Sequence, residues 1–128
     1  MLNGGLHLRI SVTAHEKRLR QMRCVVTDSR PVTLHHCHGG SMLQLGPPFS
    51  NPGMAERNNP FFQIPILLEY HTGPRGIDGS LGVDSWEDLY GSQVELLGRV
   101  NDQLEYDLWE QAERWTRENW KSTTMLSR

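Results

Sequence analysis

The 128-residue sequence predicts a single α+β domain that covers residues 1–128. Short segments of alternating apolar and polar residues in the first half predict strands. Apolar residues that recur at steps of three and four near the C-terminus predict a helix. The composition, with 37% hydrophobic and 22% charged residues, is that of an ordinary folded chain. A chain of this length and composition buries a core of its own.

The N-terminal part is expected to contain a strand, a helix and a β-hairpin. Residues 6–12, "LHLRISV", alternate apolar and polar side chains and predict a strand. Thr13 and Glu16 have the spacing of a capping box, which predicts that the short helix "AHEKRLRQM" starts here. Residues 23–27 and 32–36 flank the turn sequence "DSRP" and predict the hairpin.

The middle of the chain is expected to be irregular, with short regular pieces. Residues 39–60 are rich in Gly, Pro, Asn and Ser and predict a long loop. Residues 61–71, "FFQIPILLEYH", predict a buried extended piece followed by a helical turn. Asp84 is placed to cap a short helix, "SWEDLY", which Gly91 would end.

The C-terminal part is expected to be one long helix over residues 92–121. Ser92 and Glu95 form a capping box that would start it. The apolar stripe along this helix consists of Leu97, Val100, Leu104, Leu108, Ala112 and Trp115. At 1.5 Å per residue such a helix is ~42 Å long, more than a small domain needs. Core packing is the first interpretation of the stripe, and contact with a partner through Trp115 and Trp120 is the second.

The charges are distributed unevenly along the chain. Residues 1–40 carry six basic and two acidic side chains, a net charge of +4, whereas residues 81–128 carry five basic and ten acidic ones, a net charge of −5. The whole chain has a net charge of −2, so contact with nucleic acid must be local. Phosphate contacts are expected from the predicted basic helix, through Lys17, Arg18, Arg20 and Arg23. A solvated basic helix is the alternative.

Three of the six histidines lie in the stretch "TLHHCHGG". Neighbouring strand residues point to opposite faces, so His35 and His36 cannot chelate one ion together. At a strand end, however, one imidazole can bind a metal while the other activates water, and phosphodiester hydrolysis requires both. His71 offers another imidazole and Asp78 a carboxylate. A mixed set of this kind suits zinc, manganese or nickel, or magnesium if few ligands are nitrogen. A polar loop without such a role is the alternative.

Two further side chains near these residues are candidates. Arg75, four residues after His71, is the best single candidate for a cation near a scissile phosphate. An ordinary loop arginine is the alternative. His38 would contact phosphate when protonated, or would simply cap the loop.

Several motifs together resemble the HNH nuclease fold, also called the ββα-metal or His-Me finger. They are "CVVT", "LHH" and "IPILLEYHTGPRGIDG", followed by "SWEDLYGSQVELL" at residues 85–97. The likeness is closest to the small phage and prophage HNH proteins akin to the recombination-enhancement nucleases. It covers about residues 17–100 and implies a small ββα-metal core, flanked by the N-terminal strand and helix and the long C-terminal helix.

The resemblance also implies roles for individual residues. It makes His35 a metal ligand and His36 the general base. His71 becomes the second ligand, and Asp78 replaces the last histidine of the family pattern as a third. The asparagine of the family name has no match, because Asn58 and Asn59 lie too far ahead of "FQIP".

The sequence departs from the family in its cysteines. Many relatives hold a structural zinc ion with two C-x-x-C pairs. Here the corresponding positions are Cys24 with Thr27, and Leu67 with Tyr70. One cysteine cannot bind structural zinc tightly, so no structural zinc is expected.

Two functions follow as expectations. The first is a metal-dependent phage-type endonuclease that cleaves DNA in recombination or DNA processing. The second is an inactive HNH-like module that engages or inhibits a host protein through the C-terminal helix, or forms a homodimer there. Cys24 and Cys37 read as free thiols, which favours the cytoplasm of a bacterial host cell. No secretory signal or membrane-spanning segment is expected.

Overall fold

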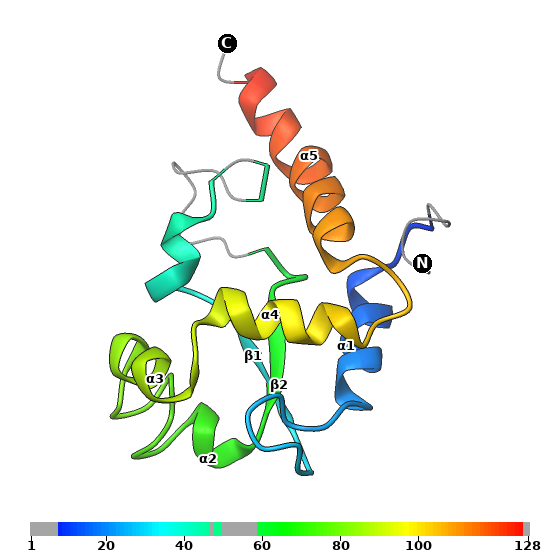
Figure 1. Ribbon diagram of the computed structural model, residues 1–128. Helices are drawn as coiled ribbons and strands as arrows, with labels where there is room; N and C mark the ends of the chain where they lie inside the picture. The colour runs from blue at the N-terminus through cyan, green and yellow to red at the C-terminus, as the bar shows by residue number, and fades with distance from the viewer. Residues whose placement is uncertain (1–7, 47, 50–58, 127–128) are drawn as a thin grey trace.

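The structure is a computed structural model that describes residues 8–46, 48–49 and 59–126, with side chains through Asn119 (Figure 1). Its elements are, in chain order, α1 (Val12–Arg20), β1 (Thr33–His36), the 3₁₀ helix η2 (Gly40–Gln44), β2 (Gln63–Ile66), α2 (Leu68–His71), α3 (Val83–Tyr90), α4 (Gln93–Asp102) and α5 (Leu108–Leu126). The α+β class is therefore confirmed.

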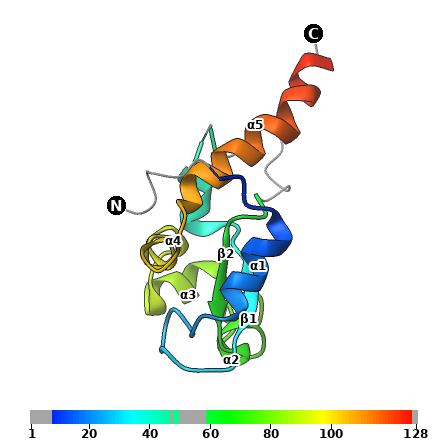
Figure 2. The same ribbon diagram turned by 90° about the vertical axis from the view of Figure 1, so that its right-hand side faces the viewer.

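The two strands form a small antiparallel sheet between helices. Thr33 pairs with Ile66 and His36 with Gln63. Helix α1 covers one face of this sheet, and α3 and α4 lie on the other side (Figure 2). Because strand side chains alternate, Thr33, His35 and their partners face the α4 side, whereas His36 faces the side of α1.

The core lies mainly between β2 and the helices that cover it. Every residue of β2 is buried, and Trp86 of α3 is fully buried. The other fully buried apolar side chains among the described residues come from α1, the turn after β1, β2, the loop after α2, and the C-terminal helices, and they are Leu19, Cys37, Ile64, Ile66, Ile77, Leu96, Leu97, Val100, Leu108 and Ala112. Burial of this apolar area is the main stabilising contribution to the fold.

The predicted N-terminal strand is wrong within the described residues, and residues 6 and 7 lie outside them. The segment before α1 is held by α5 instead: Gln111 accepts from the N–H of Ile10 at 3.0 Å and donates to the carbonyl of Leu8 at 2.6 Å. These side-chain bonds satisfy the backbone that a neighbouring strand would have paired. The helix then begins two residues earlier than the capping box predicted, because Ser11 accepts from the N–H of Ala14.

The predicted hairpin is also wrong, because β1 pairs with β2 and not with residues 23–27. The earlier segment closes on itself as a turn. The N–H of Asp28 donates to Cys24 O at 2.7 Å, and Asp28 has a positive φ of 61°. A short apolar run such as "CVVT" does not specify which strand it will pair with.

Helices α2, α3 and α4 follow the sequence prediction closely. The extended piece and helical turn expected over residues 61–71 are β2 and α2. Helix α3 ends at Gly91, as predicted, but Gly82 precedes it at the N-cap and Asp84 lies in its first turn. Ser92 caps α4 by accepting from the N–H of Glu95 at 3.0 Å.

The single helix predicted over residues 92–121 is wrong, because it is divided into α4 and α5. The chain forms a turn after α4, and Asn101 Oδ1 accepts from the N–H of Leu108 at 2.8 Å. Asp107 accepts from the N–H of Trp109 at the start of α5. Leu104 and Leu108 are nevertheless both buried. The apolar spacing therefore continues across the break and conceals it in the sequence.

The buried His15 of α1 predicts a loss of stability in acid. Burial lowers the pKa of His15 from 6.5 to about 4, although its hydrogen bond to Phe61 O and the charge of Glu16 oppose this. Between these two pH values the unfolded chain binds a proton that the folded protein does not. The free energy of unfolding should therefore fall by about 2 kcal/mol between pH 7.5 and pH 5 in urea titrations.

The His15→Leu variant isolates this contribution. It keeps the titration of all other groups but has no imidazole at this position, so its stability should depend less on pH over the same interval. An equal loss in parent and variant would show that His15 does not cause the acid sensitivity.

Candidate metal site

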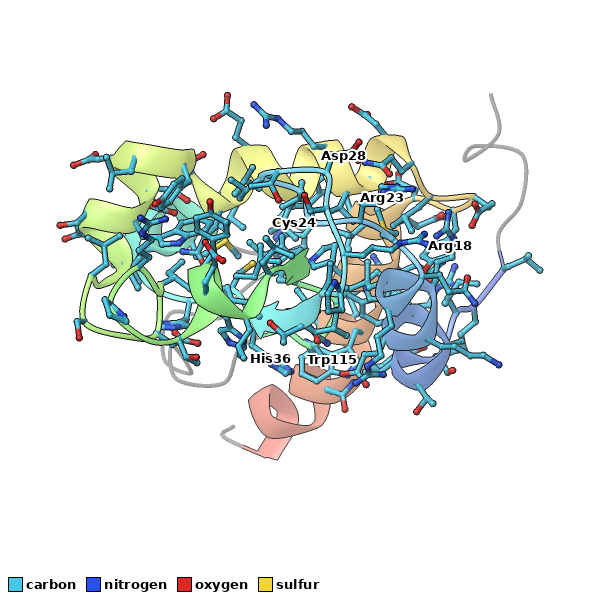
Figure 3. The ribbon with its side chains drawn as sticks, turned by 90° about the horizontal axis from the view of Figure 1, so that it is seen from below. Arg18, Arg23, Cys24, Asp28, His36 and Trp115 are labelled. Carbon is cyan, nitrogen blue, oxygen red and sulfur yellow. The ribbon has the colours of Figure 1, made fainter. Side chains whose placement is uncertain are left out.

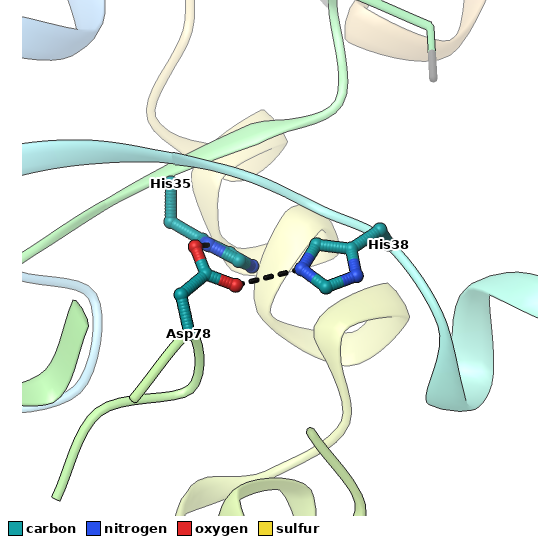
Figure 4. A group of neighbouring side chains, drawn as sticks. All are labelled: His35, His38 and Asp78. Carbon is teal, nitrogen blue, oxygen red and sulfur yellow. Dashed lines mark hydrogen bonds and ion pairs between the residues drawn. The ribbon is translucent and has the colours of Figure 1, made fainter. Parts of the chain in front are cut away.

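Four side chains converge at the end of β1 where α2 and the following loop meet it. His35 belongs to β1, His38 lies two residues beyond it, His71 is the last residue of α2, and Asp78 belongs to the loop after α2. Asp78 Oδ2 lies 3.1 Å from His35 Nδ1 and 3.1 Å from His71 Nε2. Its other oxygen, Oδ1, lies 2.7 Å from His38 Nε2. Figure 4 shows the His35 and His38 rings turned toward the Asp78 carboxylate.

The glycine-rich loop after α2 folds back and places Asp78 beside His71. The N–H of Asp78 donates to His71 O at 2.9 Å, and the N–H of Ile77 donates to Tyr70 O at 3.0 Å. The Ile77 side chain is buried in the core and anchors the loop. This backbone arrangement explains how residues seven positions apart both contribute to the cluster.

The hydrogen bonds of His71 define which of its nitrogens carries the proton. The Thr33 hydroxyl donates to Ile66 O at 3.1 Å, so its oxygen is an acceptor for His71 Nδ1, 2.9 Å away. His71 Nδ1 therefore carries the proton in the neutral ring. Its Nε2 has a lone pair, and this lone pair faces Asp78 Oδ2.

His35 reaches the same state through Gln93. The Gln93 Oε1 atom accepts from the backbone N–H of His38 at 3.0 Å, and lies 3.0 Å from His35 Nε2. His35 Nε2 must therefore donate, which leaves the lone pair of Nδ1 facing Asp78 Oδ2. Two imidazole lone pairs thus point at one carboxylate oxygen, an arrangement that a cation between them would stabilise.

The surroundings lower the pKa values of two members of the cluster. Burial lowers the pKa of His35, against the opposing effects of Gln93 and Asp78, and favours its neutral form. Burial alone would raise the pKa of Asp78, but the hydrogen bond from His38 and the attraction of the neighbouring imidazoles outweigh it, so this pKa is lowered. These two lowered pKa values favour an ionised Asp78 and a neutral His35 at neutral pH.

Three of these side chains form a group that could hold a metal ion. Donor atoms of His35, His38 and Asp78 all lie within 4.8 Å of one another, and His71 Nε2 contacts the same carboxylate. A divalent cation is compatible with this group. His35, His71 and Asp78 were predicted to come together, and they do. His38, which was predicted as a phosphate contact or a loop cap, is a fourth member of the cluster.

His36 and Arg75 are not brought to the cluster. The His36 side chain is exposed on the opposite face of the sheet from His35, and Figure 3 shows it projecting outward from β1. Arg75 is 68% exposed, and its Nη1 lies 3.7 Å from Glu69 Oε2. Asn59 is buried against α5, where it donates to Ala112 O at 2.9 Å, and Asn58 lies outside the described residues.

The basic side chains of α1 lie on the other side of the sheet from the cluster. Arg18 is engaged within the protein, since it pairs with both carboxylate oxygens of Glu105 at 2.8 and 2.9 Å. Figure 3 shows Arg18 beside the segment that joins α4 and α5. Lys17, Arg20 and Arg23 are exposed. Contact of these three with nucleic acid stays a prediction.

The two tryptophans predicted as partner contacts differ in what the structure describes. Trp115 is partly buried and packs against the core. The side chain of Trp120 lies outside the described residues.

In the described part of the chain, no helix has both the length and the apolar character that crossing a bilayer demands.

Three residues that support the site were not singled out from the sequence. Thr33 and Gln93 orient His71 and His35, and Glu87 binds Gln93 through both its backbone N–H and its side chain. Glu87 and Gln93 both lie in the stretch "SWEDLYGSQVELL", one of those on which the resemblance depends, so that stretch was the available signal. Nothing in the local sequence marks Thr33.

No protein-family model, curated protein or solved structure matches the chain at a significant level. The resemblance to HNH proteins therefore depends on the short motifs alone.

Proposed function

We propose that His35, His38, His71 and Asp78 bind a divalent metal ion and that the protein is a metal-dependent DNA endonuclease of the HNH type. The observation that carries the proposal is that His35 Nδ1 and His71 Nε2 both lie 3.1 Å from one oxygen of Asp78. The order strand, strand, helix over residues 33–71 supports the HNH assignment. So does the position of the cluster, which draws on β1, α2 and the loop that follows α2.

The donors also favour one class of metal. Three imidazole nitrogens and one carboxylate suit zinc, nickel or manganese. Magnesium prefers oxygen ligands in an octahedral arrangement, which this set does not provide. We therefore expect the site to prefer zinc, nickel or manganese over magnesium, which the sequence had left open.

The proposed reaction is hydrolysis of a phosphodiester bond. A bound divalent cation would neutralise the charge that develops on the departing 3′-oxygen. His36 is proposed to take a proton from the attacking water, whose oxygen forms the new bond to phosphorus as the bond to the 3′-oxygen breaks. His36 is the last residue of β1 and would act from that strand end. Arg75, exposed in the loop after α2, is proposed to contact the phosphate.

Two single variants test this proposal in a plasmid-nicking assay with manganese, nickel, zinc or magnesium. The parent should nick the plasmid with at least one of these metals. His71→Ala should lose both metal binding and nicking, because it removes a donor. His36→Ala should keep metal affinity, since His36 lies outside the cluster, but lose roughly 100-fold or more in rate as a missing general base.

Each outcome bears on a separate part of the proposal. An absence of nicking by the parent with every metal would contradict the endonuclease. Nicking by His36→Ala at the parental rate would instead remove the base role from His36, and His38→Ala would then be the next variant to measure.

One observation favours the second function, an inactive module that binds a protein. In both views α5 continues beyond the body of the domain at its C-terminal end (Figures 1 and 2). This end offers helix surface to a host protein or to a second copy of the chain. A mass by light scattering that stays monomeric at all concentrations would contradict self-association, and a stable host-protein complex without nicking would favour the binding module.

A further inference from the structure

The side-chain amide of Gln93 uses all of its hydrogen-bonding positions. Gln93 is the first residue of α4 and is fully buried. Its Nε2 donates to His38 O at 2.9 Å and to Glu87 Oε2 at 3.1 Å. Its Oε1 accepts from the N–H of His38 and from His35 Nε2, each at 3.0 Å. The backbone groups of His38 define this orientation, because an amide turned by 180° would place donor against donor.

Glu87 holds this amide in place from the neighbouring helix. Its carboxylate accepts from the Ser41 hydroxyl at 2.6 Å and from the Ser41 N–H at 2.9 Å. It also accepts from the backbone N–H of Gln93 at 2.8 Å. One carboxylate of α3 thereby connects η2 to the start of α4. Together these hydrogen bonds hold the Gln93 side chain in one conformation.

We propose that Gln93, held by Glu87, is a positioning residue that keeps the lone pair of His35 Nδ1 available to a metal ion. Its effect on affinity rests on the metal site proposed above, whereas its effect on the His35 ring does not. Gln93 is not itself a candidate ligand, because its oxygen is occupied by two N–H donors. It acts through the side chain of His35 and through the backbone of His38. It therefore affects two of the four proposed donors at once.

The physical reason is the choice between two neutral forms of His35. With Gln93 present, Nε2 carries the proton and Nδ1 is free. Without an acceptor at Nε2, the proton is better placed on Nδ1, where it forms a hydrogen bond to Asp78. That bond would occupy both a nitrogen and an oxygen donor. Loss of such a supporting partner typically lowers metal affinity roughly 10- to 100-fold.

The test compares Gln93→Met with Gln111→Met. Gln111 is also a buried glutamine with hydrogen bonds to backbone, but it lies on α5 and contacts Leu8 and Ile10. Zinc affinity is measured by calorimetric titration, and the His35 proton position by nitrogen NMR of metal-free, ¹⁵N-labelled protein. The parent and Gln111→Met should show a proton on Nε2 and equal zinc affinity. Gln93→Met should move the proton toward Nδ1 and lower the zinc affinity roughly 10- to 100-fold.

The two readouts separate this inference from the metal site itself. If the parent binds no zinc, the proposed site fails, and the NMR signal of His35 still decides the role of Gln93. A proton on Nδ1 in the parent, or the same proton position in parent and Gln93→Met, would overturn the inference. If circular dichroism shows that Gln93→Met is unfolded, Glu87→Gln replaces it, with a smaller change in the same direction expected and no change counting against the inference.

Discussion

Replacing Asp78 by asparagine should abolish metal binding and reduce plasmid nicking to background. Asp78 is the only side chain of the cluster that contacts all three imidazoles, through distances of 2.7 to 3.1 Å. Asparagine keeps the size of the side chain but removes the negative charge, and its NH₂ group would oppose a cation. A supporting partner alone is worth roughly 10- to 100-fold in affinity, so loss of a charged ligand should cost roughly 100-fold or more.

Asp88→Asn is the matched control for this prediction. Asp88 is an exposed carboxylate on α3, so its replacement changes the net charge of the protein by the same amount. Its metal affinity, measured by the same calorimetric titration, should equal that of the parent. Equal affinities for Asp78→Asn and Asp88→Asn would show that the cluster binds no metal through Asp78.

The sequence predicted which residues belong to the cluster better than it predicted how they are arranged. His35 and His71 lie at or near the ends of apolar segments and Asp78 lies in the loop after α2, and such positions are where the chain can bring distant side chains together. His38 was underestimated because its place depends on the turn after β1, where Gly39 has a positive φ of 64°. Loop conformation of this kind is set by tertiary contacts, here with Gln93, and short sequence patterns do not encode it.

The fold shows the same division between local and long-range information. The capping box at Ser92 and the helix end at Gly91 were predicted because both depend on a few adjacent residues. The partner of β1 was not, since residues 23–27 and 63–66 both offer apolar side chains and only the second lies beside β1 in space. Leu104 and Leu108 likewise have a helical spacing although the helix is broken between them. Both are apolar because they are buried in the core, and not because they belong to one continuous helix.

The sheet itself constrains how the proposed enzyme would meet DNA. The cluster lies on the α4 side, whereas His36 and the basic helix α1 belong to the other side. A duplex bound along α1 alone would not reach Asp78. The end of β1 is where the two sides come together, and it is also where His36 and His38 lie. Phosphate contacts that matter for cleavage are therefore expected at this strand end more than along α1.

Replacing Gly79 by alanine should disrupt the site without removing any donor. A Cβ at Gly79 would lie 2.0 Å from Gly73 O and 2.6 Å from Gly73 N. These are backbone atoms of the same loop, and Gly73 O also accepts from the N–H of Ser80 at 3.0 Å. The loop would have to open, which should cost about 3 kcal/mol in the free energy of unfolding and displace Asp78. Urea titration and zinc calorimetry measure the two effects.

Gly98→Ala distinguishes this close approach from a general effect of adding a methyl group. Gly98 lies within α4, and a Cβ there would meet nothing within 4 Å. Alanine is the better helix former, so this variant should be about 0.5 to 1 kcal/mol more stable than the parent and bind zinc equally well. A Gly79→Ala protein with parental zinc affinity would mean that Asp78 keeps its place when the loop opens. The backbone bond between Asp78 and His71 would then not be what positions the carboxylate.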